Sequence, residues 1–110
     1  MATLISYAQR LADLAAAEPD RPAVTCGPTT ITRAELERRG TRLARDLAGV
    51  GVGVGDFVTI ALPNSIDWFV AYVACWKLGA VPQPVSARLP GRELRDIVEL
   101  AGSKAVIGID

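Results

Sequence analysis

The segment Ile66–Leu78 most restricts how this chain can fold, because a helix there would be apolar on nearly every side. A helix of this kind needs to be buried against more than one neighbour. The segment before it, Phe57–Leu62, is apolar on both alternate faces, which is typical of a parallel strand covered by helices on both sides. Pro63 ends this strand, and Asn64 or Ser65 can cap the helix. Together the two segments predict an α/β fold.

The residues that follow extend the same pattern. Gly79 ends the apolar helix, and Ala80–Val85 is a predicted strand whose prolines confine it to an edge or a strand end. A helix is expected from Pro90 to Ala101, and Ala105–Ile109 is another strand of the buried type. Strand–helix–strand–helix–strand is two consecutive βαβ crossovers, each expected to be right-handed.

The first half of the chain predicts helices and a short hairpin. Apolar residues repeat every three or four positions in Thr3–Ala17, which predicts a helix that Pro19 cannot continue. Ala23–Cys26 and Thr29–Ile31 are predicted strands, joined by a turn. These elements lie before the βαβ pattern, so they flank it rather than interrupt it.

A second long helix is expected to begin after Thr32. The Thr32 hydroxyl can accept from the Glu35 amide while the Glu35 carboxylate accepts from the Thr32 backbone amide. This reciprocal pair is a capping box. A basic surface for phosphate is conceivable on this helix, but the pairs Glu35–Arg39 and Arg42–Asp46 favour a solvated face. The apolar face consists of Leu36, Leu43, Ala44 and Leu47, and the arginines are Arg38, Arg39, Arg42 and Arg45.

The glycine-rich run Gly49–Gly55 invites comparison with a nucleotide-binding loop. A dinucleotide fingerprint follows a strand and opens a helix, because the pyrophosphate must meet the helix N-terminus. Here the glycines follow a helix and lead into a strand, and no Lys-Ser or Lys-Thr closes a P-loop. The run therefore predicts a helix end and a turn.

Composition excludes several classes of function. Twelve basic and twelve acidic residues cancel, so the net positive field typical of nucleic-acid binders is missing. The chain has no His, and Cys26 and Cys75 form no CxxC pair, so no zinc or thioredoxin-like site is expected. Each cysteine is expected to be a small buried hydrophobe with a reduced thiol.

Neither a secretory signal nor a membrane-spanning segment is expected from the sequence. The start, Met1–Leu14, lacks the basic flank and long apolar run of a secretory signal. The longest apolar stretch, Trp68–Trp76, is far shorter than the roughly 20 residues of a transmembrane helix. A cytoplasmic location without a membrane-spanning segment is therefore expected.

A three-stranded sheet with three or four helices leaves much surface uncovered, so the chain is expected to be one lobe of something larger. We expect Phe69 and Val73 to pack on the strands, and Trp68 and Trp76 to face a second boundary. The predicted fold class is α/β: a parallel-sheet lobe with flanking helices and a short N-terminal β-hairpin.

Five strings in this order and spacing resemble the N-terminal part of the AMP-forming acyl-adenylating enzymes, which include acyl-CoA synthetases, luciferases and peptide-synthetase adenylation domains. The string Ile31–Leu36 resembles the family's "T-Y-x-E-L" signature, and the string Trp76–Pro82 resembles its "K-x-G-A-x-x-x-P" element. The resemblance spans residues 4–110. The strings are Leu11–Val24, Ile31–Leu36, Gly51–Val58, Leu62–Ser65 and Trp76–Pro82.

The sequence departs from the family pattern at two places. Arg33 stands where the family usually has Tyr, and Gln83–Pro90 replaces the commoner continuation of the last string. The form "P-Q-P-V-S-x-R-L-P" resembles the actinobacterial branch of acid–CoA ligases that act on bile, steroid or long-chain acids. The resemblance thus implies an enzyme, and the lobe would be part of a larger enzyme fold.

The resemblance implies a two-step reaction. A carboxylic acid and ATP with Mg²⁺ would give an acyl-adenylate and pyrophosphate, and the CoA thiol would then displace AMP. The family's phosphate loop, magnesium-ligating Glu and catalytic Lys have no counterpart in residues 1–110. Residues 1–110 are therefore expected to be the N-terminal lobe of an AMP-binding domain that stops before the phosphate loop, inactive alone.

No catalytic, cofactor-binding or metal-ligating residue is assigned from the sequence. Asn64 or Ser65, at a helix N-terminus after a parallel strand, is the one place where topology favours an anion, although plain capping is the preferred interpretation. Lys77 and Lys104 are expected to be solvated.

Two alternatives remain open at this point. The chain could be a stand-alone interaction module that binds a partner, or a second copy, through an exposed apolar face. This face would lie around the aromatic residues of the helix Ile66–Leu78, which are Trp68, Phe69, Tyr72 and Trp76. It could instead belong to a peptide-synthetase-type adenylation domain, whose acceptor is a carrier-protein thiol.

Overall fold

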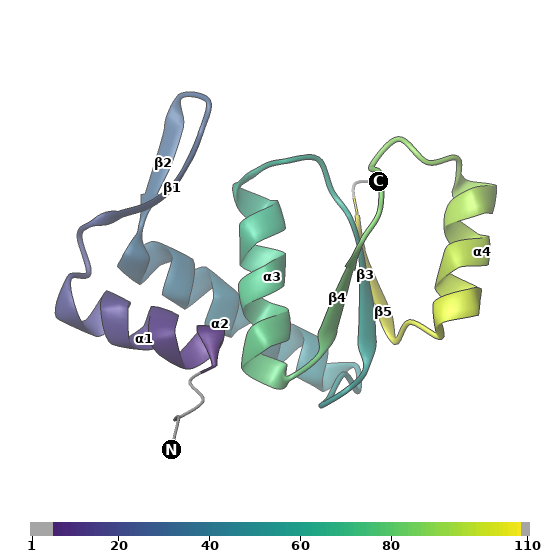
Figure 1. Ribbon diagram of the computed structural model, residues 1–110, viewed down its shortest axis with the longest axis horizontal. Helices are drawn as coiled ribbons and strands as arrows, with labels where there is room; N and C mark the ends of the chain where they lie inside the picture. The colour runs from purple at the N-terminus through teal and green to yellow at the C-terminus, as the bar shows by residue number, and fades with distance from the viewer. Residues whose placement is uncertain (1–5, 109–110) are drawn as a thin grey trace, which may run out of the picture.

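The computed structural model describes residues 6–108. It is a mixed α/β fold in which a hairpin and two helices precede a parallel sheet (Figure 1). In chain order the elements are α1 (Tyr7–Ala17), β1 (Pro22–Cys26), β2 (Thr29–Thr32), α2 (Arg33–Gly49), β3 (Phe57–Ala61), α3 (Ile66–Leu78), β4 (Val81–Pro84), α4 (Gly91–Ala101) and β5 (Ala105–Gly108).

The predicted fold class is confirmed. β3 lies in the centre of a three-stranded parallel sheet of order β4-β3-β5, and β1 pairs with β2 as an antiparallel hairpin. The proline-containing strand β4 lies at an edge, as two prolines require. The predictions made for Leu4 and Ile109 lie outside the described residues.

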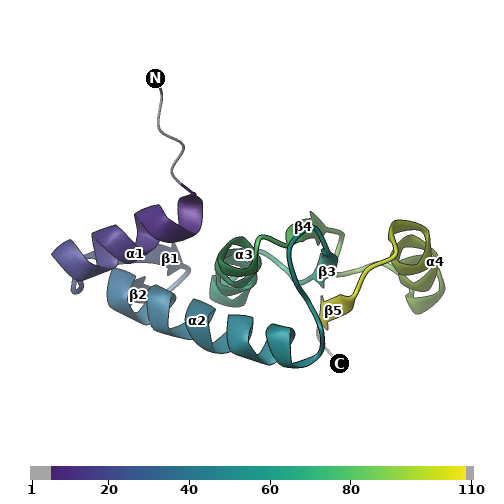
Figure 2. The same ribbon diagram turned by 90° about the horizontal axis from the view of Figure 1, so that it is seen from below.

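The two crossovers place helices on opposite faces of the sheet. The chain passes from β3 to β4 through α3, and then returns past β3 to β5 through α4. Because crossovers of one hand that run in opposite directions lie on opposite faces, α3 and α4 lie on either side of the sheet. Figure 2 shows α2 and α3 on one side and α4 alone on the other.

The main core lies between β3 and the helices α2 and α3. Val58 and Ile60 are fully buried in the middle of β3. Opposite them, α3 presents Ala71, Ala74 and Cys75, which are also fully buried and small enough to let the helix approach the sheet closely. The other buried members of this core are Ala44, Leu47, Val52 and Ala80.

A second core joins α2, α3 and the hairpin. Gly40 in the middle of α2 is buried, and a Cβ there would overlap the side chain of Val73 on α3. This glycine therefore sets the distance at which the two helices cross. The buried residues of the second core are Ile31, Leu36, Val70 and Val73.

The expected orientation of α3 was wrong in part. Val73 faces α2 rather than the strands, and Phe69 is 39% exposed, whereas Trp68 packs against the main core. At 3.6 residues per turn, the three small residues of α3 share the side that meets the sheet, so its large side chains flank that contact. Trp76 is 36% exposed, and its expected contact with a second boundary stays a prediction.

The predicted helix ends are largely confirmed. The Glu35 amide donates to Thr32 Oγ1 at 3.1 Å, but the Glu35 carboxylate pairs with Arg38 and Arg39 instead of reaching back, so half of the capping box forms. The glycine run ends α2 and turns the chain into β3, with positive φ angles of 97° at Gly51 and 80° at Gly55.

We predict that Gly40→Ala lowers the free energy of unfolding by about 1–3 kcal/mol, because the new methyl group forces α2 away from α3. Urea melts measure this loss. The matched control is Gly49→Ala at the end of the same helix, where a Cβ meets nothing within 4 Å; it should leave stability unchanged or raise it by up to about 1 kcal/mol. Equal effects of the two substitutions would contradict the close crossing.

Candidate functional site

A pocket of about 440 Å³ lies at the carboxyl ends of β3 and β4. The loops that leave these neighbouring strands run to α3 and α4, on opposite faces of the sheet. Such a switch point is where open α/β sheets usually bind ligands. We name it the switch-point pocket; its lining residues are Leu62, Pro63, Asn64, Trp68, Pro84, Val85, Ser86, Ala87 and Arg88.

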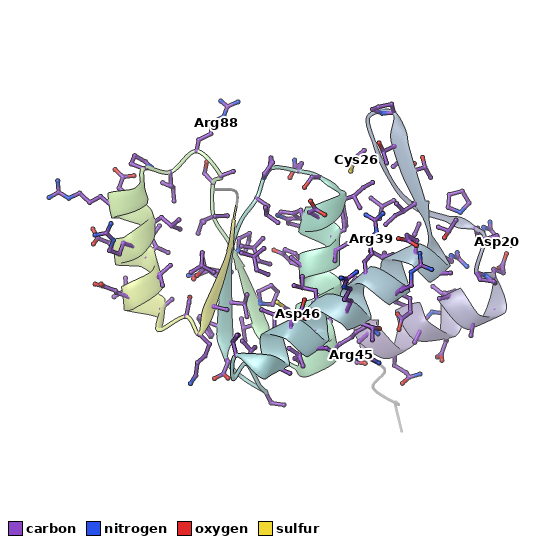
Figure 3. All side chains as sticks on the ribbon, turned by 180° about the vertical axis from the view of Figure 1, so that it is seen from behind. Asp20, Cys26, Arg39, Arg45, Asp46 and Arg88 are labelled. Carbon is purple, nitrogen blue, oxygen red and sulfur yellow. The ribbon has the colours of Figure 1, made fainter. Side chains whose placement is uncertain are left out.

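The lining combines one aromatic wall with a few polar groups. Trp68 stacks on Tyr72 with ring centroids 4.0 Å apart, which fixes the indole beside the pocket. Ser86 Oγ accepts from the Arg88 amide at 3.2 Å and holds the turn after β4. Arg88 is exposed on that turn and points away from the fold (Figure 3). The pocket can contact a ligand, but its lining offers no carboxylate, His or thiol for acid–base or nucleophilic chemistry.

The structure places Ser65 as a helix cap. Ser65 Oγ accepts from the Trp68 amide at 3.3 Å and donates its proton to the Pro63 carbonyl at 2.9 Å, so the hydroxyl has no proton left to donate to a ligand. Asp67 lies in the first turn of α3 and already supplies a negative charge at this helix end. The capping interpretation is therefore confirmed, and Asn64 stays exposed at the rim of the switch-point pocket.

A second pocket, also about 440 Å³, lies between the hairpin, α2 and the start of α3. Cys26 and Arg39 line it and are labelled in Figure 3. Arg39 Nε donates to Glu35 Oε1 at 2.7 Å, so this cation is already paired. The remaining lining residues are Gly27, Thr29, Asn64, Ser65, Ile66 and Asp67.

Arg38, Arg39, Arg42 and Arg45 form a solvated face of α2, as expected. Arg38 and Arg39 are exposed and pair with Glu35. Within the described residues, the predicted pair Arg42–Asp46 is not formed, and both side chains are exposed. Exposed ion pairs of this kind contribute little to stability.

The expectation that Lys77 is solvated was wrong. Its side chain is 17% exposed and forms an ion pair with Glu37 across the α2–α3 contact. Lys77 lies one or two turns from Val70 and Val73 on the same side of α3, and that helical spacing is the signal that sequence reasoning missed. Lys104 is exposed, as expected. Neither lysine lines a pocket described above.

The two cysteines differ in environment. Cys75 is fully buried, and burial raises the pKa of its thiol to about 11. Cys26 is only half-buried in β1, so the expectation of a buried hydrophobe holds for Cys75 and fails for Cys26. The failure follows from the hairpin, which has one side in solvent.

Residues 6–108 offer neither a metal site nor a membrane-spanning helix. In that range no group of three His, Cys, Asp or Glu side chains could hold a metal ion. None of the helices described there is long and apolar enough to cross a membrane.

Comparison with known proteins gives one family. The family described as AMP-binding enzyme matches residues 11–109. The chain is 35% identical over 107 residues to a medium/long-chain-fatty-acid–CoA/3-oxocholest-4-en-26-oate–CoA ligase of Mycobacterium marinum, which covers 94% of this chain and 20% of the ligase.

Two solved structures show the same fold. An artificially fused adenylation–PCP di-domain NRPS from Klebsiella oxytoca, NpsA–ThdA, superposes with a TM-score of 0.87 at 28% identity, over 99% of this chain and 21% of that chain. The N-terminal domain of FACL13 from Mycobacterium tuberculosis superposes with a TM-score of 0.83 at 28% identity, over 94% and 26%. The chain thus spans about a quarter or less of each protein named here.

We predict that a thiol reagent modifies Cys26 rapidly at pH 8, whereas Cys75 reacts only when the chain unfolds, because its thiol is buried and protonated. Timed labelling followed by peptide mass spectrometry measures both rates. Cys26→Ala is the control that isolates the slow thiol. Equal rates at the two positions in the folded chain would contradict the burial of Cys75.

Proposed function

This chain belongs to the AMP-binding enzyme family, and we propose that it forms the N-terminal lobe of an acid–CoA ligase. The enzyme would activate a fatty, bile or steroid acid with ATP to an acyl-adenylate and transfer the acyl group to CoA. The observation that carries this proposal is the likeness to the Mycobacterium marinum ligase, which extends over 94% of the chain.

The lobe's role would be to form part of the wall of the active site. The switch-point pocket supports this role, because it combines the Trp68 ring and Arg88 at the edge where open α/β sheets usually bind ligands. ATP phosphates need a cradle of backbone amides and Mg²⁺ needs carboxylate ligands. The residues of this pocket do not fit either group, so no chemical step is assigned to them.

The Mg²⁺, ATP and CoA of the full enzyme are therefore expected to meet residues outside this segment. Trp68 would contribute a rigid apolar surface, since its ring is held by Tyr72. Arg88 would contribute a cation at the rim. A cytoplasmic location suits a reaction that consumes ATP and CoA.

A peptide-synthetase adenylation domain is the second candidate. The likeness to NpsA–ThdA, with a TM-score of 0.87, favours it. The two candidates share the adenylation step and differ in the acceptor, which is CoA in one and a carrier-protein thiol in the other. A stand-alone interaction module is a third candidate, motivated by the exposed Phe69 and Trp76.

We predict that the purified chain releases no pyrophosphate from ATP and a carboxylic acid. A chimera in which the chain replaces the matched region of the Mycobacterium marinum ligase should form acyl-CoA from a long-chain acid. Pyrophosphate release and mass spectrometry of the products measure both, with the intact ligase as control. Pyrophosphate release by the chain alone, or a folded chimera that forms acyl-adenylate but no acyl-CoA, would contradict the proposal.

A further inference from the structure

Four aromatic rings form a row that runs from α1 along α3 to the switch-point pocket. Trp76 contacts Tyr7 with ring centroids 5.1 Å apart, and the start of α1 lies beside the end of α3 (Figure 1). Tyr72 meets Trp76 edge-on at 6.1 Å and stacks on Trp68 at 4.0 Å, with an angle of 27° between the two stacked planes. Trp68 is the member that lines the pocket. We name Tyr7, Trp76, Tyr72 and Trp68 the aromatic row.

The spacing of the aromatic row along α3 explains why its rings meet. Trp68, Tyr72 and Trp76 follow one another at intervals of four residues, so they share one side of the helix. Helical side chains lean toward the N-terminus of their helix, and each of these rings therefore leans over the one before it. Because α3 begins just after the carboxyl end of β3, the row leans toward the switch-point pocket.

Trp68 is restrained both on its face and on its edge. Tyr72 covers one face of the indole, and Phe69 meets the indole edge-on with centroids 5.1 Å apart. Tyr72 is itself supported by Trp76, whereas Phe69 is exposed. Offset-stacked and edge-on pairs are the arrangements that aromatic rings prefer, because the negative face of one ring then avoids the negative face of the other. Tyr72 is therefore the residue best placed to fix the plane of the indole.

The switch-point pocket surrounds this indole with apolar side chains and one cation. An indole plane beside apolar side chains suits the apolar part of a ligand, and the guanidinium of Arg88 suits an anion. A mobile ring would lose conformational entropy when a ligand bound, and a ring that is already held avoids this cost. The apolar lining residues beside Trp68 are Leu62, Pro63, Pro84, Val85 and Ala87.

We propose that Tyr72 is a positioning residue, which holds the Trp68 indole in one orientation so that the switch-point pocket presents a preformed wall to a substrate. Tyr72 lines neither of the two pockets described above, so it acts through Trp68 rather than by touching the substrate. Loss of the Tyr72 ring should therefore weaken substrate binding and leave the chemical step unchanged. The effect on substrate binding rests on the proposed function, whereas the restraint on the indole does not.

The first experiment measures how freely the Trp68 ring moves in this chain. Trp76→Phe keeps a ring in the aromatic row and leaves Trp68 as the single indole for time-resolved fluorescence anisotropy. The order parameter of the indole should fall from about 0.85, typical of a rigid group, to below about 0.6 when Tyr72→Leu is added. Tyr72→Phe retains the ring and should leave the indole rigid. Urea melts show which variants are folded, and Tyr72→Met takes the place of Tyr72→Leu if the latter does not fold. An indole that stays rigid without the Tyr72 ring, or that moves equally in Tyr72→Phe, would overturn the proposal.

The second experiment measures the kinetics of the chimera with the Mycobacterium marinum ligase. Tyr72→Leu should raise the KM for the long-chain acid, ATP or CoA at least about fivefold while kcat stays within about twofold, and Tyr72→Phe should restore that KM. The matched control is Tyr7→Leu, the same change at the far end of the aromatic row, where Tyr7 is 71% exposed; it should leave all three KM values unchanged.

The proposal fails if Tyr72→Leu changes no KM in an active chimera, or if Tyr7→Leu has the same effect. The proposed function fails separately. A folded chimera that is inactive without any further substitution refutes the ligase, and the anisotropy of the Trp68 indole then decides the role of Tyr72.

Discussion

The close packing of α3 between the sheet and α2 is the interaction on which the rest of the structure depends. Small side chains at Ala71, Ala74 and Cys75 let the helix lie on Val58 and Ile60, all of them fully buried. Gly40 then lets α2 cross close to the other side of α3. Two sides of α3 therefore pack against the sheet and α2, and its aromatic residues lie on the remaining side. This arrangement holds the hairpin and α1 as well, because both pack on the helices rather than on the sheet.

The same packing positions the candidate site. With α3 on one face of the sheet and α4 on the other, the loops after β3 and β4 part at their carboxyl ends and leave the switch-point pocket between them. Ser65 caps α3 at this edge, and the stacked ring of Trp68 forms a fixed wall. The described fold therefore has a pocket at the sheet edge where open α/β sheets usually bind ligands, and a helix, α4, without a buried residue on the other face.

Most of the fold follows from the sequence because its signals are local. Pro63, Gly79 and the cap at Ser65 bound α3, and the apolar segment Phe57–Leu62 predicts a parallel strand covered on both faces. The rotation of α3 was mispredicted because the helix is apolar on nearly every side, so periodicity cannot rank its faces; side-chain size decided which face meets the sheet. Lys77 was likewise mispredicted, because its partner Glu37 is 40 residues away in sequence. The switch-point pocket requires the strand order, which periodicity alone does not give.

Native-state hydrogen exchange of the purified chain tests the central claim most directly, namely that a closed α2–α3–β3 core carries an open side at α4. The account predicts the slowest exchange at the buried amides of β3 and α3, at a rate set by global unfolding, and exchange at least about a hundredfold faster throughout α4 by local opening. Protection of α4 equal to that of β3, or fast exchange at Val58 and Ile60, would contradict it.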